Sequence, residues 1–537
     1  MLGPLTASCL LALWLIVYPR TPDLAAQVYR VGLFRALGFA VWDEHWYAGH
    51  HLPGYSLLLP PLGSLLGLRL VGALSVFGSV TCFERLAQGT YGRAARWGTA
   101  FFALAAVCDL WIGRVAFALG VSFALAAALA FARGRPLAAG VLSALCAAAS
   151  PVAGVLLALA GLTCLMSERS PRALLSLVAP PALVVVPLAL LFPEGGFEPY
   201  PLRSFLATLI VIVAFLWALP PRERLLRRGG HLYLLACLLC LLVHSPMGSN
   251  IERYAVLLAG PLLVCALLRA GKGTRAGDLR AGAGRAPATS ADGLHAAAVA
   301  PALALIAVWV LWGPVRETLA VAGNQSTSAS YYLPVERFLA RQPGPVRVEV
   351  PLTRSHWEAA LLAPTVSLAR GWEKQLETRF DHVLLSRGLS AGAYDRWLHE
   401  QAVDYVAMPD TPLDPSSAEE GRLIRGGLPF LRKVFLARHW TIYAVRSPAP
   451  LLVGPGRLTS LGHDSFALRA SSPGSFLVRV HFTRYWTLAS GGGCVGPAPG
   501  GWTSVRVRAP GPVLVLARFS LGRALGSERS CETKEDS

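Results

Sequence analysis

Charged residues are scarce in this sequence: they make up only 15% of the 537 residues, whereas soluble globular proteins average about 25%. Hydrophobic residues account for 54%, and the mean hydropathy is +0.49. So little charge and so much apolar surface exclude a single water-soluble enzyme. The sequence instead predicts a polytopic membrane protein.

Several signatures of common enzymes are also missing. The chain has no GxxxxGK[ST] phosphate loop, no HExxH zinc helix, no GxSxG elbow and no cysteine spacing typical of zinc. No internal repeat is obvious, and the ionisable residues gather in the predicted outer loops rather than midway through the bilayer. This pattern favours chemistry or binding at the outer face over transport.

Acidic residues are outnumbered by basic ones, 31 to 49, which gives a net charge of +18. The basic residues cluster in short loops between apolar segments, where positive charge holds loops on the cytoplasmic side and attracts anionic lipid. Membrane lipid is therefore an expected partner, and nucleic acid is not.

Long apolar runs are abundant, and eleven of them predict membrane spans. They cover Leu2–Tyr18, Tyr55–Cys82, Thr99–Ile112, Val115–Ala132, Leu137–Ala149, Val152–Met166, Ala173–Phe192, Phe205–Leu219, His231–Val243, Tyr254–Leu268 and Ala296–Trp312. Because several are short and Pro151 separates two of them, one pair could instead be a broken or re-entrant helix. With the N-terminus inside, an odd number of spans places everything after Trp312 outside the cytoplasm.

Changes in composition divide the chain into four parts. We expect a transmembrane domain at 1–323, which includes a long first outer loop at 19–54 and a flexible basic connector at 270–294. Strand-like VRVEV and helix-like AYDRWLHEQA predict an α/β domain at 324–448, and alternating segments such as SFLVRVHF predict a β-sandwich-like domain at 449–525. Residues 526–537 form an acidic, disordered tail.

Only two of the ten cysteines, Cys494 and Cys531, fall in the polar C-terminal region. Because disulfides persist in oxidising compartments, the two residues could form a disulfide if this region is extracytoplasmic. The sequence leaves that pairing open.

The first outer loop is too long and too polar for a passive turn between two spans. Asp23 directly follows the first span, and Trp42, Trp46 and Tyr47 suit an anchor at the membrane interface. We expect this loop to pack into a surface helix and a lid.

At this loop the sequence resembles the GT-C superfamily of membrane glycosyltransferases, which take sugars from polyprenyl-phosphate carriers. The resemblance lies in Pro22-Asp23 after span one, Trp46-Tyr47-Ala48-Gly49 further along, and Leu59-Pro60-Pro61-Leu62 at the entry to span two. The chain is also similar to actinobacterial multi-span proteins of uncertain function that carry a WYxGHHxPGYS stretch. The resemblance implies a GT-C-like membrane fold.

The resemblance also implies roles for two acidic residues. Asp23 would be the general base for the acceptor hydroxyl or a ligand of a divalent cation, and Asp109 a second acidic helper. Alternatively, Asp23 could cap a juxtamembrane helix, and Asp109 could form a structural ion pair with Arg114. The need for a divalent cation stays open.

A lipid-phosphate donor requires fixed cations, for which arginine is well suited. Arg114 and Arg253 are the candidates, although Arg253 could instead pair with Glu252 beside it. His50 and His51 could add donors or could be structural.

Two further groups of residues are candidates. Asp43 and Glu44 resemble an acidic pair used by one branch of the fold, but they rank below Asp23 because they lie further from span one. Four aromatic residues of the C-terminal region are expected to bind acceptor glycan or a partner: Trp357, Trp397, Trp440 and Trp486.

Together these expectations describe a bacterial membrane glycosyltransferase with an extracytoplasmic C-terminal α/β plus β-sandwich region. It would reside in the cytoplasmic membrane and transfer a sugar from a polyprenyl-phosphate donor to a glycan or glycolipid acceptor of the cell envelope. The alternative is a noncatalytic membrane scaffold or a transporter that has kept the fold.

Overall fold

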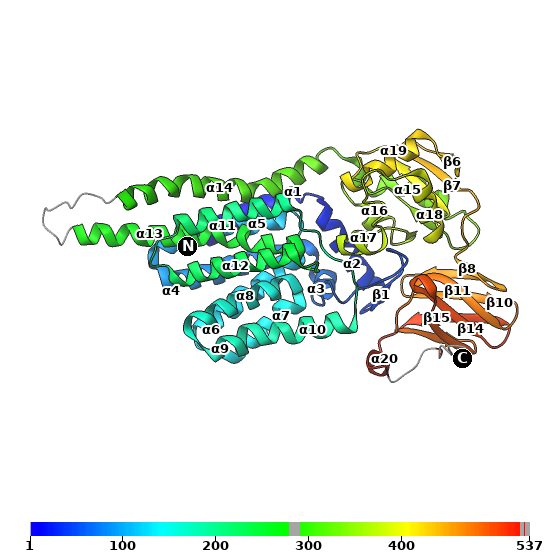
Figure 1. Ribbon diagram of the computed structural model, residues 1–537, viewed down its shortest axis with the longest axis horizontal. Coiled ribbons are helices and arrows are strands. Elements are labelled where there is room, and N and C mark those ends of the chain that lie inside the picture. Colours follow the sequence, from blue (N-terminus) through cyan, green and yellow to red (C-terminus); the bar gives the residue numbers. More distant parts are fainter. Residues whose placement is uncertain (1, 279–289, 527–530, 532–537) are drawn as a thin grey trace. The chain divides into compact units, whose positions relative to one another are not determined.

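The apolar runs of the chain form helices, because an α-helix satisfies its own backbone polar groups in lipid. The computed structural model describes residues 2–278, 290–526 and 531, and the chain forms two compact units (Figure 1). Unit 1 comprises Met1–Leu24, Tyr55–Leu190 and Phe197–Leu319. Unit 2 comprises Ala25–Gly54, Leu191–Gly196 and Ala320–Ser537.

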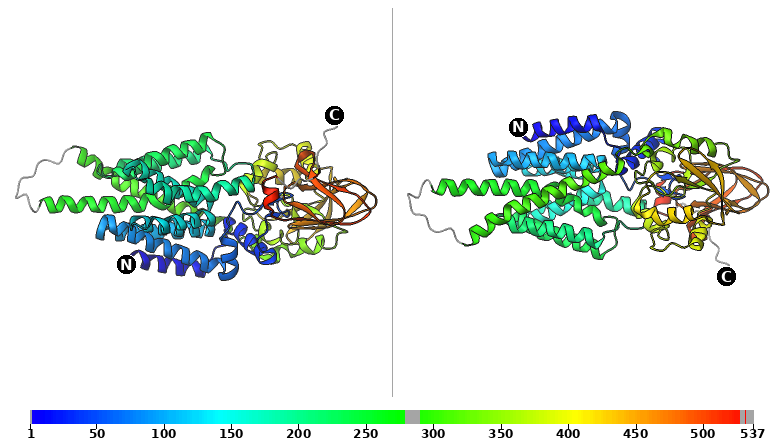
Figure 2. Two further views of the ribbon diagram at one scale, coloured as in Figure 1. Left: turned by 90° about the horizontal axis from the view of Figure 1, so that it is seen from below. Right: turned by 90° about the horizontal axis from the view of Figure 1, so that it is seen from above.

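Unit 1 is helical. Its helices are α1 (Leu2–Val17), α3 (Leu59–Leu66), α4 (Leu68–Tyr91), α5 (Ala95–Trp111), α6 (Val115–Ala132), α7 (Pro136–Ala149), α8 (Pro151–Glu168), α9 (Pro171–Ala173), α10 (Ala179–Leu191), α11 (Leu202–Ala218), α12 (Arg224–Leu242), α13 (Arg253–Asp278) and α14 (Ser290–Val321). Helix α5 packs against α1, α4 and α13, and α6 packs against α4 and α7. Figures 1 and 2 both show these helices running side by side.

Helix length separates the membrane-span candidates. Among the described residues, six helical segments are long and apolar enough to cross a membrane, or seven if α1 and α2 (Pro22–Leu37) form one bent span. One of the six, Leu68–Trp111, contains both α4 and α5, and three further apolar helices, α7, α8 and α11, are shorter. The chain is therefore a multi-pass membrane protein, and eleven spans stays a prediction.

The break at Pro151 separates two helices. Pro151 is the first residue of α8, where its missing N–H costs no hydrogen bond, and the Ser150 side chain accepts a hydrogen bond from the Ala153 amide. Helices α7 and α8 pack against each other. The predicted pair is therefore two distinct short helices.

The first part of unit 2 is a mixed sheet with the strand order β4-β3-β5-β7-β6. The strands are β3 (Arg347–Glu349), β4 (Ser367–Leu368), β5 (Tyr405–Pro409), β6 (Leu431–Leu436) and β7 (Trp440–Val445), and the accompanying helices are α15 (Ala329–Leu339), α16 (Glu358–Leu361), α17 (Lys374–Phe380), α18 (Ala391–Glu400) and α19 (Ala418–Gly426). Strand β3 is parallel to β4 and β5, whereas β7 is antiparallel to β5 and β6. The predicted strand VRVEV and the predicted helix AYDRWLHEQA are both present.

The second part of unit 2 consists of two four-stranded antiparallel sheets. Their orders are β12-β15-β10-β9 and β13-β14-β11-β8. The strands are β8 (Leu452–Val453), β9 (Gly456–Gly462), β10 (Ser465–Ala470), β11 (Gly474–His481), β12 (Trp486–Ser490), β13 (Gly493–Pro497), β14 (Trp502–Val507) and β15 (Gly511–Ala517), and α20 (Leu521–Ala524) follows. Alternate apolar residues such as Phe466, Val478, Val505 and Val515 are buried, as expected for a β-sandwich.

Most of the first predicted outer loop belongs to unit 2. Strands β1 (Trp42–Asp43) and β2 (His50–His51) form a short antiparallel pair, and Trp46 forms a bridge with Leu368 of β4. Trp42, Trp46 and Tyr47 are buried, and the Trp46 indole N–H donates to the Ala359 carbonyl. The prediction that these aromatic side chains anchor the loop at the membrane interface was therefore wrong.

The four tryptophans expected to bind glycan are also buried. Trp397, Trp440 and Trp486 each donate the indole N–H to another residue of unit 2, and Trp357 is 4% exposed. A tryptophan ring buried in a protein core could stack on a sugar only if the surrounding domain unfolded. That prediction was wrong.

Two segments expected to be flexible fall partly outside the described residues. The basic connector predicted at 270–294 is shortened because α13 continues to Asp278 and α14 begins at Ser290, and residues 279–289 lie outside the described part. Of the predicted tail, only Gly526 and Cys531 are described.

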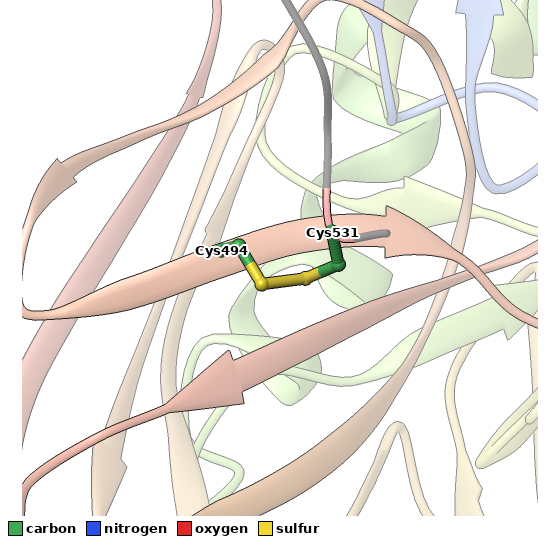
Figure 3. The surroundings of a disulfide bond; sticks show 2 residues. All are labelled: Cys494 and Cys531. Carbon is green, nitrogen blue, oxygen red and sulfur yellow. A yellow bond between two sulfur atoms is a disulfide. The ribbon is translucent and has the colours of Figure 1, made fainter. Parts of the chain in front are cut away.

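Cys494 on β13 and Cys531 form a disulfide (Figure 3). The residues are 37 positions apart, and closing a loop of that size stabilises a fold by about 3 to 4 kcal/mol in the chain-entropy account. We therefore expect Cys494→Ser to lower the free energy of unfolding of the sandwich by that amount, measured by chemical denaturation without reductant. The matched control is Cys9→Ser, because Cys9 is an exposed free cysteine.

The same disulfide also tests on which side of the membrane the sandwich lies. Disulfides persist outside the cytoplasm, so peptide mapping of protein alkylated before reduction should recover Cys494 and Cys531 linked. Recovery of both residues as alkylated thiols would contradict an extracytoplasmic C-terminal region.

Candidate functional site

Asp23, Asp109 and Arg114 converge in unit 1. Arg114 Nε donates to Asp23 Oδ2 at 3.1 Å, and its NH1 donates to Asp109 Oδ1 at 3.0 Å. Asp23 lies in the first turn of α2, Asp109 lies near the end of α5, and Arg114 immediately precedes α6. Three segments therefore form one ionic cluster, which contains the Asp109–Arg114 ion pair that the sequence left open as an alternative.

A glycine turn brings these segments together. Gly113 has a φ of +102°, and a Cβ added there would lie 2.6 Å from the Leu24 amide nitrogen and 2.7 Å from Thr21 Oγ1. The Thr21 hydroxyl in turn donates to the Ile112 carbonyl at 2.7 Å. Only glycine allows the α5–α6 turn to approach the start of α2 this closely.

The exposure of the two carboxylates differs. The Asp23 side chain is 33% exposed, whereas the Asp109 side chain is 3% exposed. A carboxylate in the first turn of a helix also interacts favourably with the helix dipole, so Asp23 both stabilises α2 and contacts Arg114. Of the two, Asp23 is the one that a substrate could reach.

Arg253 is the fourth candidate residue near this cluster. It lies at the start of α13, interacts electrostatically with Arg114, Asp109 and Asp23, and places its guanidinium over the Phe117 ring, 5.1 Å from the centroid. Its NH2 donates to Asn250, while its buried Nε has no hydrogen-bond partner among the residues that the structure describes. The buried Nε–H of Arg253 is therefore a donor that could bind an incoming anion, such as a phosphate oxygen.

Arg114 keeps its charge in this environment. Burial alone would lower its pKa, but Asp109 and Asp23 raise the pKa above its ordinary value. The neighbouring Glu252 also interacts electrostatically with Arg114. Arg114 is therefore a permanently charged cation held between Asp23 and Asp109.

His50 and His51 belong to unit 2 and have structural contacts there. The His50 ring nitrogen Nδ1 lies 3.1 Å from the Asp43 carbonyl, and His51 lies between Glu194 and the Thr483 hydroxyl. The structure does not bring them into the cluster of Asp23, Asp109, Arg114 and Arg253. Their predicted role in binding substrate stays a prediction.

Asp43 is the centre of a buried polar group in unit 2. It accepts hydrogen bonds from the Tyr29 hydroxyl at 2.8 Å and from His463 Nδ1 at 2.9 Å. Burial raises the pKa of Asp43, but the hydrogen bond from His463 and the nearby His50 and His45 outweigh it and lower that pKa to about 2. Tyr29 and His463, which the sequence analysis missed, therefore hold Asp43 ionised within the core.

Glu44 forms an ion pair with Arg347, also unforeseen. The Arg347 NH2 donates to Glu44 Oε1 at 2.7 Å, and both side chains are fully buried. Arg347 also donates to the carbonyls of Gln401 and Arg479. This pair joins the loop to both parts of unit 2, so Asp43 and Glu44 are structural residues here.

A second unforeseen cluster surrounds Arg370. Four buried carboxylates lie within 4.0 Å of its guanidinium, at distances of 3.7, 4.0, 3.9 and 3.2 Å for Glu349, Glu377, Asp381 and Glu420 respectively. Glu349 also interacts with Glu420, and both carboxyl groups are fully buried. Burial raises the pKa values of Glu349, Asp381 and Glu420. Because one guanidinium cannot neutralise four carboxylates, repulsion from neighbouring carboxylates raises the pKa values of Glu349 and Asp381 further.

Among the described residues, no group of three or more histidine, cysteine, aspartate or glutamate side chains has the arrangement to hold a metal ion. Asp23 and Asp109 supply two carboxylates at the unit 1 cluster. A divalent cation there would need further oxygen ligands from a bound substrate, such as phosphate oxygens.

No family model matches this chain, and no curated protein matches it either. The structure is similar to the crystal structure of ArnT from Cupriavidus metallidurans bound to undecaprenyl phosphate. The similarity covers 83% of this chain and 98% of that chain, with 15% sequence identity and a TM-score of 0.43. A likeness this distant assigns neither an activity nor a site residue, and kinship with actinobacterial proteins stays a prediction.

Proposed function

We propose that this chain is a membrane glycosyltransferase that moves a sugar from a polyprenyl-phosphate donor to a glycan or lipid acceptor of the cell envelope at the outer face. The observation that carries the proposal is the convergence of Asp23 and Asp109 on Arg114, with Arg253 in electrostatic range. Such a site combines an accessible carboxylate for a hydroxyl proton with arginines suited to phosphate.

In the proposed inverting reaction, the oxygen of the acceptor hydroxyl attacks the anomeric carbon of the donor sugar. Asp23 accepts the proton of that hydroxyl at the same time. The bond from that carbon to the phosphate oxygen breaks, and its electron pair leaves with the phosphate. Arg114 and Arg253 stabilise the charge that develops on the phosphate. Asp109, which is buried, holds Arg114 in place and is therefore a positioning residue.

A transfer assay tests this proposal. The full chain in proteoliposomes should move labelled sugar from a polyprenyl-phosphate sugar to envelope lipid or glycan extract. Arg253→Gln should raise the KM for the lipid donor by roughly 10-fold or more, since a hydrogen bond to a charged group contributes about 1.5 to 3 kcal/mol. The matched control is Arg422→Gln, which removes an exposed arginine of unit 2.

The outcomes separate the alternatives. A folded protein that transfers no sugar from any of a panel of polyprenyl-phosphate donors would contradict the proposal and favour the scaffold. Substrate flux without transfer would favour the transporter.

Gly113→Ala provides an independent test of the geometry. The added Cβ would clash with Leu24 and Thr21, and a positive φ is unfavourable for alanine. We expect the Asp23–Arg114 contact to be displaced and kcat to fall at least 10-fold, measured beside the melting temperature. The control is Gly134→Ala, which also places alanine at a positive φ but has open space around it. If kcat falls only in Gly113→Ala, backbone strain by itself does not explain the loss.

A further inference from the structure

One end of the β-sandwich exposes a group of large apolar side chains around α20. Phe519, Leu521 and Leu525 are 46%, 66% and 79% exposed. Phe519 lies between β15 and α20, Leu521 is the first residue of α20, and Leu525 directly follows α20, which is labelled in Figure 1. Single exposed apolar residues are common on soluble surfaces, but three within seven positions form a patch that favours a partner.

This patch is linked to the end of a membrane helix. Leu191, the last residue of α10, accepts a hydrogen bond from the Tyr485 hydroxyl at 2.8 Å. The next residue, Phe192, packs against Tyr485 and Phe519, with ring centroids 5.4 and 5.9 Å apart. Leu191 and Phe192 both belong to unit 2.

The helical segment that ends with α10 is strongly apolar. It runs from Pro171 to Leu191, comprises α9, Leu174–Val178 and α10, and is long enough to span a membrane. Phe192, which follows this segment directly in the chain, contacts Phe519 of the patch. Apolar side chains joined this closely to a candidate membrane span suit lipid better than bulk water.

Basic residues accompany the apolar ones. Arg484 and Arg518 are exposed, and Arg484 NH1 donates to the Ala524 carbonyl at the end of α20. Exposed arginines beside exposed leucine and phenylalanine are typical of segments that lie in a membrane interface, where the cations meet lipid phosphates.

We propose that this patch, formed by Phe519, Leu521 and Leu525 with Arg484 and Arg518, is an interfacial anchor that binds phospholipid at the surface of the bilayer in which the span 171–191 ends. Its partner is the lipid surface, not a second copy of the chain. The anchor does not depend on the proposed transferase activity.

Photocrosslinking of the full chain tests the anchor. p-Benzoylphenylalanine at Leu525 is irradiated in nanodiscs that contain phosphatidylcholine and phosphatidylglycerol, and adducts are identified by mass spectrometry. The matched control carries the same residue at Val453, an exposed apolar position on β8 of the same sandwich. We expect a phospholipid adduct at Leu525 and none at Val453, with melting temperatures equal to the parent.

Each other result overturns the proposal or part of it. A crosslink between two chains would assign the patch to self-association, and the absence of a lipid adduct at Leu525 would show that it faces water. In phosphatidylcholine alone the yield at Leu525 should fall at least twofold. An equal yield would overturn the role given to Arg484 and Arg518.

Discussion

Asp23→Asn is expected to lower the kcat of sugar transfer by roughly 10²- to 10⁴-fold, the range typical of a lost general base. Asparagine keeps the size and the hydrogen-bond acceptor for Arg114 but cannot accept the hydroxyl proton. Because Asp23 is one-third exposed, the melting temperature should stay close to that of the parent. Transfer from a labelled polyprenyl-phosphate sugar, with thermal unfolding in parallel, measures both.

Substitution of the buried Asp109 should lower stability as well as activity. Asp109→Asn removes one of two carboxylates around Arg114 at a site that is 3% exposed, so the melting temperature should fall together with activity. Glu419→Gln, at a partly exposed surface pair, is the control for removal of an acidic charge. Full transfer by Asp23→Asn would exclude Asp23 as the base.

Arg370→Met is expected to cost unit 2 about 3 to 5 kcal/mol of unfolding free energy, the usual penalty for removing one partner of a buried ionic group. Four buried carboxylates would lose the guanidinium that lies within 4.0 Å of each of them. The loss should be smaller at pH 5 than at pH 8, because protonation removes the unpaired charges. Denaturant unfolding of the full chain, followed by tryptophan fluorescence, measures this.

The control for that variant is Arg422→Gln, whose arginine is 66% exposed and should change stability by less than about 0.5 kcal/mol. The parent should also respond to pH. A buried carboxyl whose pKa is raised, such as Glu349, stabilises the fold most when protonated, so its contribution is lost as the pH rises from its unfolded pKa through its folded pKa. Glu349→Gln should flatten this dependence, and an unchanged slope would contradict the cluster's role.

The sequence predicted the site in unit 1 better than the polar core of unit 2. Asp109 and Arg114 are five residues apart, and Asp23 stands directly after a span, so local position already singled out all three. Their convergence needed the Gly113 turn, which hydrophobic periodicity does not reveal. Strands and helices of the C-terminal region were predictable because their apolar alternation is strong.

The clusters of Arg347 and Arg370 were not predictable, because each includes an acidic residue that is distant in sequence from the arginine. Glu44 and Arg347 are 303 residues apart, and Arg370 and Glu420 are 50 apart. The predicted roles of the tryptophans at the membrane interface and in glycan binding were wrong for a related reason. An aromatic side chain is equally suited to a membrane interface, a sugar surface and a core, and only tertiary packing decides between them.

The place of the first loop within unit 2 has a consequence for biogenesis. Glu44 meets Ser367, which is synthesised 323 residues later, so at ordinary translation rates the loop waits roughly 15 to 65 s for its partner. During that delay Trp42, Trp46 and Tyr47 have no core to enter. The nascent chain must therefore keep an aromatic segment from aggregating while the remaining spans insert. A protein expressed from a gene fragment that begins after α14 would therefore lack strands β1 and β2, which belong to unit 2.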